Sequence, residues 1–210
     1  MNSAALITKS FIDTSHDVGG LTIFDMDDTL IKSHAQVHVV DAQGNHIKLL
    51  DGEFKDYKLA PGERFSFEEF NSSLIFKTTS SPIDHMIEHA QDILHHIAHR
   101  EKSRVIILTA RNNFDNQKMF FETLNQHGID TRKIIVEFAG NVALAQELSG
   151  PQAKKVIIDN YLKTNEYDQV RLFDDYMPNL DKFLELKPQY PHIEFSAFLV
   201  NRDGSVSTYK

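Results

Sequence analysis

The 210-residue chain contains no cysteine and no tryptophan. Without cysteine it can form no disulfide and can use no thiolate as a nucleophile or metal ligand. Basic residues are also in the minority, with 22 against 30 acidic residues and a formal net charge of −8. This balance argues against a broad basic surface for nucleic acid or anionic lipid, although a small basic pocket stays compatible with it.

Long apolar runs are missing as well. The first twenty residues, MNSAALITKSFIDTSHDVGG, carry polar side chains throughout, and we expect neither a signal peptide nor a transmembrane helix. The sequence shows no repeat and no low-complexity linker. These features favour a soluble, cytoplasmic protein with no membrane partner. The length suits a single domain spanning residues 1–210 with an insertion, and 41% apolar and 25% charged residues are ordinary for a globular chain.

Apolar runs of strand length alternate with segments of helical periodicity. The runs expected to form strands are LTIFDM (21–26), RVIILTA (104–110), KIIVEFA (133–139) and QVRLFDD (169–175). The segments expected to form helices are 81–100, capped by Ser81 with Pro82 in its first turn, 113–127, 151–165 and 178–186. Continuous apolar strands that alternate with helices are typical of a parallel sheet covered on both faces. The sequence therefore predicts an α/β fold, and the C-terminal IEFSAFLVNRDGSVSTYK predicts two more strands around the turn NRDG.

The stretch between the first predicted strand and the first predicted helix interrupts this alternation. We expect an insertion there, at about residues 33–80. Within it, residues 35–50 have two β-rich arms around DAQGN, which indicates a hairpin. The rest is short for a large cap and indicates a small lid. Its aromatic cluster, Phe65, Phe67 and Phe70, would either pack the lid or stack on a base.

Polar side chains collect where the predicted strands end. Asp25 and Asp27 end the first strand, and Thr109 ends another. Asp174 and Asp175 end a third. We expect these residues to converge, because ligands of open α/β sheets bind outside the carboxyl ends of the strands and alternate residues of a strand point to the same side. Four carboxylates at one edge repel one another, so we expect Mg²⁺, which prefers oxygen ligands, with a phosphate as its co-ligand.

Four motifs, in this order, make the chain resemble the haloacid dehalogenase superfamily of phosphatases. They are DMDDT (25–29), which fits Asp-x-Asp-x-Thr, ILTAR (107–111), GPQAKK (150–155) and LFDDYMPN (172–179). The resemblance covers about residues 21–186, and the stretch EFKDYKLAPGERFSFEEF looks like small members from bacteriophages. It implies a Rossmann-like parallel sheet flanked by helices. It also implies a β-hairpin flap directly after the nucleophile strand, followed by the small lid.

The resemblance implies a role for each motif residue. Asp25 would be the nucleophile that forms an aspartyl phosphate, and Asp27 would protonate the leaving oxygen and then activate water. Thr109 would hydrogen-bond the transferring phosphoryl group, and a lysine of GPQAKK would offset its charge. Mg²⁺ would be held by Asp25, the backbone carbonyl of Asp27, and Asp174, with Asp175 binding directly, through water or behind the ligands. An acid at position 27 favours phosphate-ester hydrolysis or phosphoryl transfer over dehalogenation.

Several assignments stay open at this point. On a helical wheel Lys154 lies within the packed face and Lys155 toward its edge, so we favour Lys154 as the catalytic and substrate-binding lysine. Arg111 would bind substrate or pair with a surface acid. Asn179 would support the acidic loop or start the next helix. Asp28 is expected to face away from its neighbours and to favour a helix start.

Histidine pairs at helical spacing raise the question of a zinc site. His85 and His89 are four residues apart, as are His95 and His99. That spacing can hold zinc, but a clear third ligand is missing from the pattern. A solvated helix face is the better interpretation.

The sequence supports three functional hypotheses. The first is a Mg²⁺-dependent phosphomonoesterase that acts on a small phosphorylated metabolite or nucleotide. The second is a nucleic-acid end phosphatase, which an open site permits and the net charge of −8 disfavours. The third is a non-enzymatic domain that binds metal or phosphate, which the complete set of acids disfavours.

Overall fold

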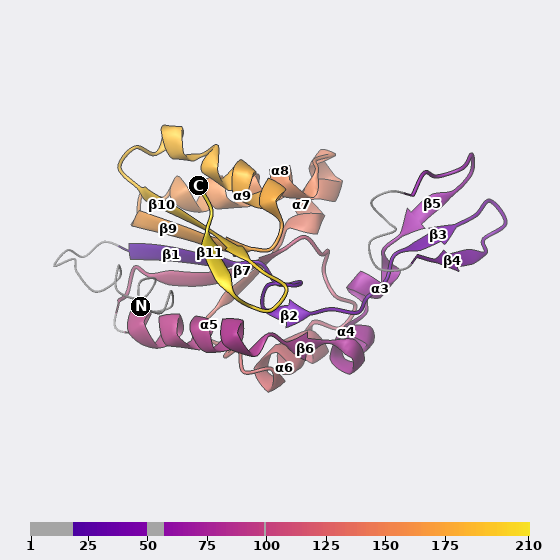
Figure 1. Ribbon diagram of the computed structural model, residues 1–210, viewed down its shortest axis with the longest axis horizontal. Helices are drawn as coiled ribbons and strands as arrows, with labels where there is room; N and C mark the ends of the chain where they lie inside the picture. Colours follow the sequence, from indigo (N-terminus) through magenta and orange to yellow (C-terminus); the bar gives the residue numbers. More distant parts are fainter. Residues whose placement is uncertain (1–18, 50–56, 99) are drawn as a thin grey trace.

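The computed structural model describes residues 19–49, 57–98 and 100–210. Its main body is built on a six-stranded sheet with the order β11-β10-β9-β1-β7-β8 (Figure 1). The strands are β1 (Gly19–Phe24), β7 (Arg104–Thr109), β8 (Ile135–Phe138), β9 (Tyr167–Asp174), β10 (Glu194–Val200) and β11 (Val206–Thr208). β11 is antiparallel to β10, and the other neighbouring strands run parallel.

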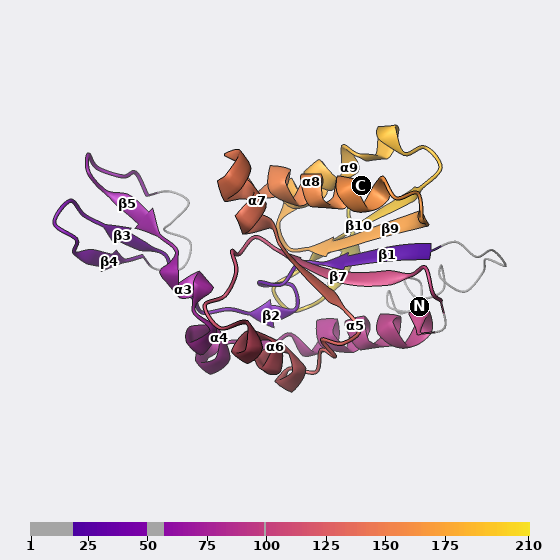
Figure 2. The ribbon, with the colours of Figure 1, turned by 180° about the vertical axis from the view of Figure 1, so that it is seen from behind.

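Helices cover both faces of this sheet (Figures 1 and 2). One face carries α5 (Asp84–Ile97) and α6 (Gln117–Gln126), and the other carries α7 (Ala139–Gln146), α8 (Gly150–Leu162) and α9 (Met177–Leu184). Each face has its own apolar core, with Met86 of α5 in one and Ile158 of α8 in the other. β1 is buried at every position because it lies between both layers. The predicted α/β fold with a mostly parallel sheet is confirmed.

The strand order places β1 at a switch point of the sheet. From β1 the chain continues to β7 and β8 on one side, and it then crosses back to β9 and β10 on the other. In open sheets of this kind the crevice for ligands forms at the carboxyl ends of the strands where the order reverses. The motif residues at the ends of β1, β7 and β9 lie at that edge.

A three-stranded sheet lies apart from the main body (Figure 1). In this small sheet, β3 (His38–Val40) pairs antiparallel with β4 (His46–Lys48) and with β5 (Arg64–Ser66). One connecting segment, 33–37, leads out from β2 (Ile31–Lys32), and the other, 67–72, returns through α3 (Glu68–Asn71) to α4 (Ser73–Thr79). The hairpin predicted around DAQGN is confirmed by β3 and β4, while residue 50 of the predicted range lies outside the described residues.

The helix predicted at 81–100 begins later than expected. Ser81 and Pro82 form β6, which pairs antiparallel with β2. α5 then begins at Asp84, with Ile83 at the N-cap position. The prediction that Ser81 caps this helix is therefore wrong, because a pairing with a distant strand uses the backbone of residues 81–82.

Other element ends also differ from the sequence pattern. α6 begins at Gln117, where Asn116 caps it by accepting from the amide of Met119. α8 begins with a capping box formed by Ser149 and Gln152. α7 was not predicted, since the apolar residues of AGNVALAQ follow no clear face. Among the helices of the described ranges, none combines the length and apolar character that a membrane crossing needs.

Candidate functional site

The strand register brings the acids of two motifs to neighbouring positions. Phe24 of β1 pairs with Phe173 of β9, and the amide of Asp25 donates to the carbonyl of Phe173 over 2.9 Å. Asp25 and Asp174 therefore leave adjacent strands at the same level of the sheet. Both are buried, Asp174 completely. The predicted meeting of the strand-end acids is thus present for these two carboxylates.

Lys154 reaches this pair of acids from α8. Its Nζ lies 2.5 Å from Oδ1 of Asp25 and 2.9 Å from Oδ2 of Asp174, and the residue is buried. The next residue, Lys155, instead lies at the surface, with its Nζ 2.8 Å from Oε2 of Glu185. The structure places Lys154 rather than Lys155 among the acids, in the orientation that the helical wheel predicts.

Asp175 completes a group of three carboxylates, which we call the acidic group. One oxygen from each of Asp25, Asp174 and Asp175 lies within 4.8 Å of the others, so the group could hold a metal ion. Across residues 19–49, 57–98 and 100–210 this is the only such group of histidine and acidic side chains. Three carboxylates face one ammonium, that of Lys154, which leaves negative charge in excess.

Burial and neighbouring charge together shift the pKa values in this site. Burial and nearby carboxylates raise the pKa of Asp25 well above its usual value, although Lys154 opposes the shift. Burial would lower the pKa of Lys154, but Asp174 and Asp25 raise it above its ordinary value. Desolvation, followed by the charges of Asp174 and Asp28, raises the pKa of Asp175 to about 6. The part of these shifts that comes from neighbouring carboxylates reflects an excess of negative charge, which would also attract a cation.

The loop after β9 is held against Asp174 by two amide groups. The backbone amide of Tyr176 donates to Oδ1 of Asp174 over 2.9 Å. The side-chain Nδ2 of Asn179 lies 2.9 Å from both carboxylate oxygens of Asp174. Tyr176, not Asn179, occupies the N-cap position of α9. Of the two roles left open for Asn179, its contacts bear out support of the acidic loop.

Asp27 lies at the same edge but has a different partner. Arg111 donates from Nε to Oδ2 over 2.9 Å and from Nη2 to Oδ1 over 2.7 Å. Thr109 Oγ1 lies 3.4 Å from Oδ2 of Asp27 and accepts from the amide of Arg111 over 3.1 Å. The carboxylate of Asp27 is therefore outside the acidic group. Metal binding through the backbone carbonyl of Asp27, and phosphoryl binding by Thr109, stay predictions.

The loop that carries Arg111 packs tightly against the start of α7. The amide of Gly140 donates to the carbonyl of Arg111 over 3.1 Å. A Cβ at Gly140 would lie 2.4 Å from Oδ1 of Asn112 and 2.6 Å from the carbonyl oxygen of Ala110. Glycine fits there without displacing the loop. The sequence carries no clear signal for this support, because the pattern of α7, whose first turn contains Gly140, does not predict a helix.

Several sequence candidates lie outside the site. Asp28 is exposed and adopts a left-handed backbone conformation with φ of 56°. It is not part of the acidic group, although its charge contributes to the raised pKa of Asp175. The predicted helix start at Asp28 is wrong, because the chain turns there into β2.

His85 is exposed, whereas His89 is half-buried and packs against Phe24 and Phe173. The predicted solvated helix face therefore holds for His85 but is wrong for His89. His89 is not part of a metal-binding group. His99, which completes the second spaced pair, lies outside the described residues.

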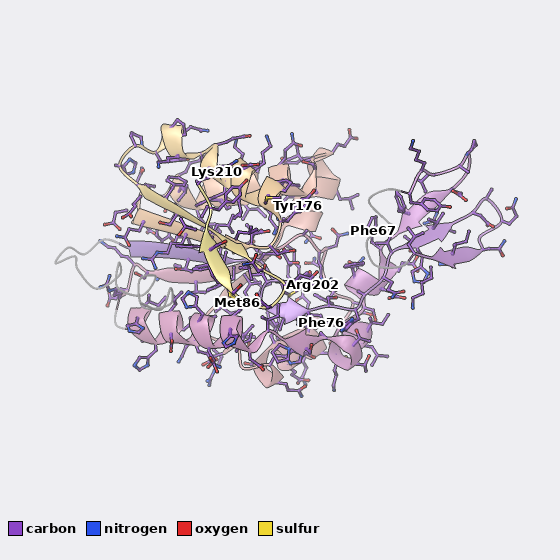
Figure 3. The ribbon with its side chains drawn as sticks, viewed as in Figure 1. Phe67, Phe76, Met86, Tyr176, Arg202 and Lys210 are labelled. Carbon is purple, nitrogen blue, oxygen red and sulfur yellow. The ribbon has the colours of Figure 1, made fainter. Side chains whose placement is uncertain are left out.

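The aromatic cluster of the insertion packs against itself. The ring centroids of Phe65 and Phe67 are 6.3 Å apart, and those of Phe67 and Phe70 are 6.2 Å apart. Figure 3 shows Phe67 at the base of the small sheet, where this sheet joins the main body. These contacts favour the packing interpretation over base stacking.

The chain was also compared with known proteins. A scan against protein-family models finds no match, and a search of curated proteins finds no significantly similar sequence. A functional assignment therefore depends on the geometry of this edge and on the motif resemblance.

Proposed function

We propose that the protein is a Mg²⁺-dependent phosphomonoesterase that acts through an aspartyl phosphate on Asp25. Its substrate would be a small phosphorylated metabolite or nucleotide. The observation that carries the proposal is the buried contact of Lys154 with Asp25 and Asp174, which come from two adjacent strands at the switch point. The resemblance of the four motifs to phosphatases supports the same assignment.

The acidic group suits a hard divalent cation. Its three side chains offer oxygen ligands only, which Mg²⁺ prefers, and Mg²⁺ completes its shell with water and phosphate oxygens. The three carboxylates outnumber the single ammonium of Lys154, and the remaining negative charge would also attract a cation. When bound, Mg²⁺ would offset the charge of the acids and of the transferring phosphoryl group.

The residues of the chain divide the chemistry between them. The carboxylate of Asp25 would attack phosphorus while the bond to the leaving oxygen breaks, and Asp27 would give that oxygen its proton. Asp27 would then take a proton from the water that hydrolyses the acyl phosphate. Lys154 would orient Asp25 and offset developing negative charge. Asn179 would hold Asp174 in place for the cation.

The small sheet would serve as the flap and lid of this site. It follows β1 in the chain and lies apart from the main body. A small lid leaves room for substrates of different size. Because the residues at the strand ends would hold the phosphate, the lid would contact the leaving group.

Hydrolysis of p-nitrophenyl phosphate tests the proposal. We expect turnover with Mg²⁺, loss of turnover with a chelator, and no comparable hydrolysis of bis(p-nitrophenyl) phosphate, a diester. A panel of nucleotides, sugar phosphates and 3′- or 5′-phosphorylated oligonucleotides would then identify the substrate class. Full activity of the metal-free protein would contradict the metal assignment, and inactivity on every phosphomonoester would contradict the proposed function.

The raised pKa of Asp175 predicts that Mg²⁺ binding weakens in acid. Because protons and the cation compete for this carboxylate, affinity should fall as the pH drops below about 6, the pKa of Asp175. The same shift makes Asp175 favour folding in its protonated form, a contribution that is lost as the pH rises through about 6. Asp175→Asn should therefore raise the melting temperature of the metal-free protein at neutral pH and reduce its stabilisation by Mg²⁺.

Thermal unfolding with chelator and with Mg²⁺, at about pH 5 and about pH 7.5, measures both effects. Glu122→Gln is a suitable control, since Glu122 lies on the surface of α6 and pairs only weakly with Lys118 at 3.9 Å. Equal stabilisation of the wild type by Mg²⁺ at both pH values would show that Asp175 does not help to bind the cation.

A further inference from the structure

Arg111 has an unusually complete set of partners for a residue next to a substrate site. The residue is buried, and besides Asp27 its guanidinium binds two groups. Nη2 donates to Oγ of Ser33 over 2.6 Å, and Nη1 donates to the carbonyl of Phe70 over 2.7 Å. With the two bonds to Asp27, these contacts engage four of the five N–H groups of the side chain. A phosphate could bind Arg111 in a bidentate manner only by displacing some of them.

The two additional partners come from the two segments that connect the small sheet to the main body. Ser33 directly follows β2, on the outgoing segment 33–37. Phe70 lies in α3, on the returning segment 67–72. The guanidinium of Arg111 therefore contacts both connecting segments as well as the carboxylate of Asp27.

The two connecting segments are also tied to each other beside Arg111. Oε2 of Glu69 in α3 accepts from the amide of Gln36 over 2.8 Å, and Oε1 lies 2.7 Å from Nε2 of His38. Movement of one segment would therefore carry the other with it. The position of Arg111 depends on both segments together.

Aromatic rings hold the guanidinium from its other sides. Its central carbon lies 4.9 Å from the ring centroid of Phe70, 5.4 Å from that of Phe76 and 5.3 Å from that of Phe114. Such contacts favour a fixed, desolvated cation. Phe70 belongs to the connection, whereas Phe114 belongs to the loop after β7. Arg111 is packed between a segment that connects to the small sheet and the loop after β7 in the main body.

We propose that Arg111 is a positioning residue that couples the small sheet to Asp27. With both connecting segments in place, Arg111 holds the Asp27 carboxylate at the edge of the site. When they shift, Arg111 loses Ser33 and the Phe70 carbonyl, and Asp27 loses its fixed orientation. The reactivity of the acid thereby depends on the position of the small sheet. This inference rests on the proposed phosphatase function for the role of Asp27.

Two esters that differ in their leaving group separate positioning from phosphate binding. Arg111→Lys keeps a positive charge but cannot hold three partners in a fork. Because Arg111 acts through the acid, kcat/KM, which reports phosphoryl transfer to Asp25, should fall about 10- to 100-fold more for phenyl phosphate than for p-nitrophenyl phosphate, whose leaving group needs no proton. KM should not rise for either ester. Ser33→Ala should shift the same ratio in the same direction, by less, and Arg132→Lys, a control at an exposed ion pair, should not.

A double variant gives a second test. If Arg111 acts through Asp27, adding Arg111→Lys to Asp27→Asn should change kcat less than about 3-fold, because the residue it positions is already inactive. A phosphate-binding arginine would instead raise KM for both esters equally, and its effect would multiply with that of Asp27→Asn. That second pattern would overturn the proposal.

Hydrogen exchange tests the coupling without catalysis. Amides of residues 33–38 and 66–73 should exchange faster in Arg111→Lys, in Ser33→Ala and in Asp27→Asn than in the wild type or in Arg132→Lys. If the wild type hydrolyses neither ester, the proposed function fails, while faster exchange in these variants still supports the coupling. Unchanged exchange in all three variants would overturn the coupling whatever the activity.

Discussion

Asp25→Asn is expected to abolish turnover while the protein stays folded. An amide cannot form the acyl phosphate, and loss of a nucleophile that forms a covalent intermediate typically lowers kcat by roughly 10⁴–10⁶-fold. Folding should survive because Asp25 is held in a charge-rich site that raises its pKa, and Lys154 keeps its contact with Asp174. The variant should still bind substrate, since it removes a charge that repels phosphate. Steady-state kinetics measures the loss of turnover, and intact mass after incubation with p-nitrophenyl phosphate tests whether a covalent phosphoenzyme forms.

The neighbouring acids provide matched comparisons. Asp27→Asn keeps the nucleophile, so attack on an activated ester should survive, and a covalent phosphoenzyme should accumulate because its hydrolysis lacks a base. Asp28→Asn should retain most activity, since Asp28 is exposed and lies outside the acidic group. A phosphorylated Asp25→Asn protein would refute the assignment of the nucleophile. A folded but inactive Asp28→Asn protein would refute the roles assigned to Asp25, Asp27 and Asp28.

Lys154→Ala should have the second-largest effect, on both stability and turnover. Lys154 is buried between two buried carboxylates, and removal of one partner of a buried ion pair typically costs about 3–5 kcal/mol because it leaves charge without compensation. Turnover should fall roughly 10²–10³-fold, as for loss of one donor aimed at developing charge. Mg²⁺ should stabilise this variant more than the wild type, since the cation replaces part of the missing charge.

Lys155→Ala is the matched control for that experiment. Its ammonium pairs with Glu185 at the surface, and exposed pairs contribute about 0–1 kcal/mol. Urea unfolding of both variants, with chelator and with Mg²⁺, gives the comparison, and kinetics on p-nitrophenyl phosphate gives the second. An equal loss of stability in the two variants would show that the buried contacts of Lys154 do not carry the expected energy.

The sequence predicts best those features that depend on the burial pattern within a single strand or helix. A central parallel strand is covered on both faces, so its sequence is mostly apolar, and the run before Asp25 shows this with Thr22 as its one polar member. The same reasoning put Lys154 on the inner side of α8, because the packed face of a helix repeats at a regular angle. It failed at Ser81 and Pro82, where pairing with β2 outweighs a favourable capping pattern.

The partner of Arg111 shows where the sequence was insufficient. The choice lay between substrate and a surface acid, and the structure pairs Arg111 with Asp27, 84 residues away in the chain. No local pattern relates these two residues, because their distance depends on how β1 and β7 align. Ser33 and Phe70 had no sequence signal for the same reason: they meet Arg111 only once both connections to the small sheet have folded.

The sequence by itself determined the alternation of buried strands and helices, and the placement of acids at strand ends, since both depend on the period of the backbone and on which side chains avoid water. Tertiary structure decided which charges become partners. Asp25 meets Lys154 across 129 residues, and Asp27 meets Arg111, because the switch point aligns the ends of three strands and α8 approaches from one side. Buried charges need partners at hydrogen-bonding distance, and only the packed fold sets those distances.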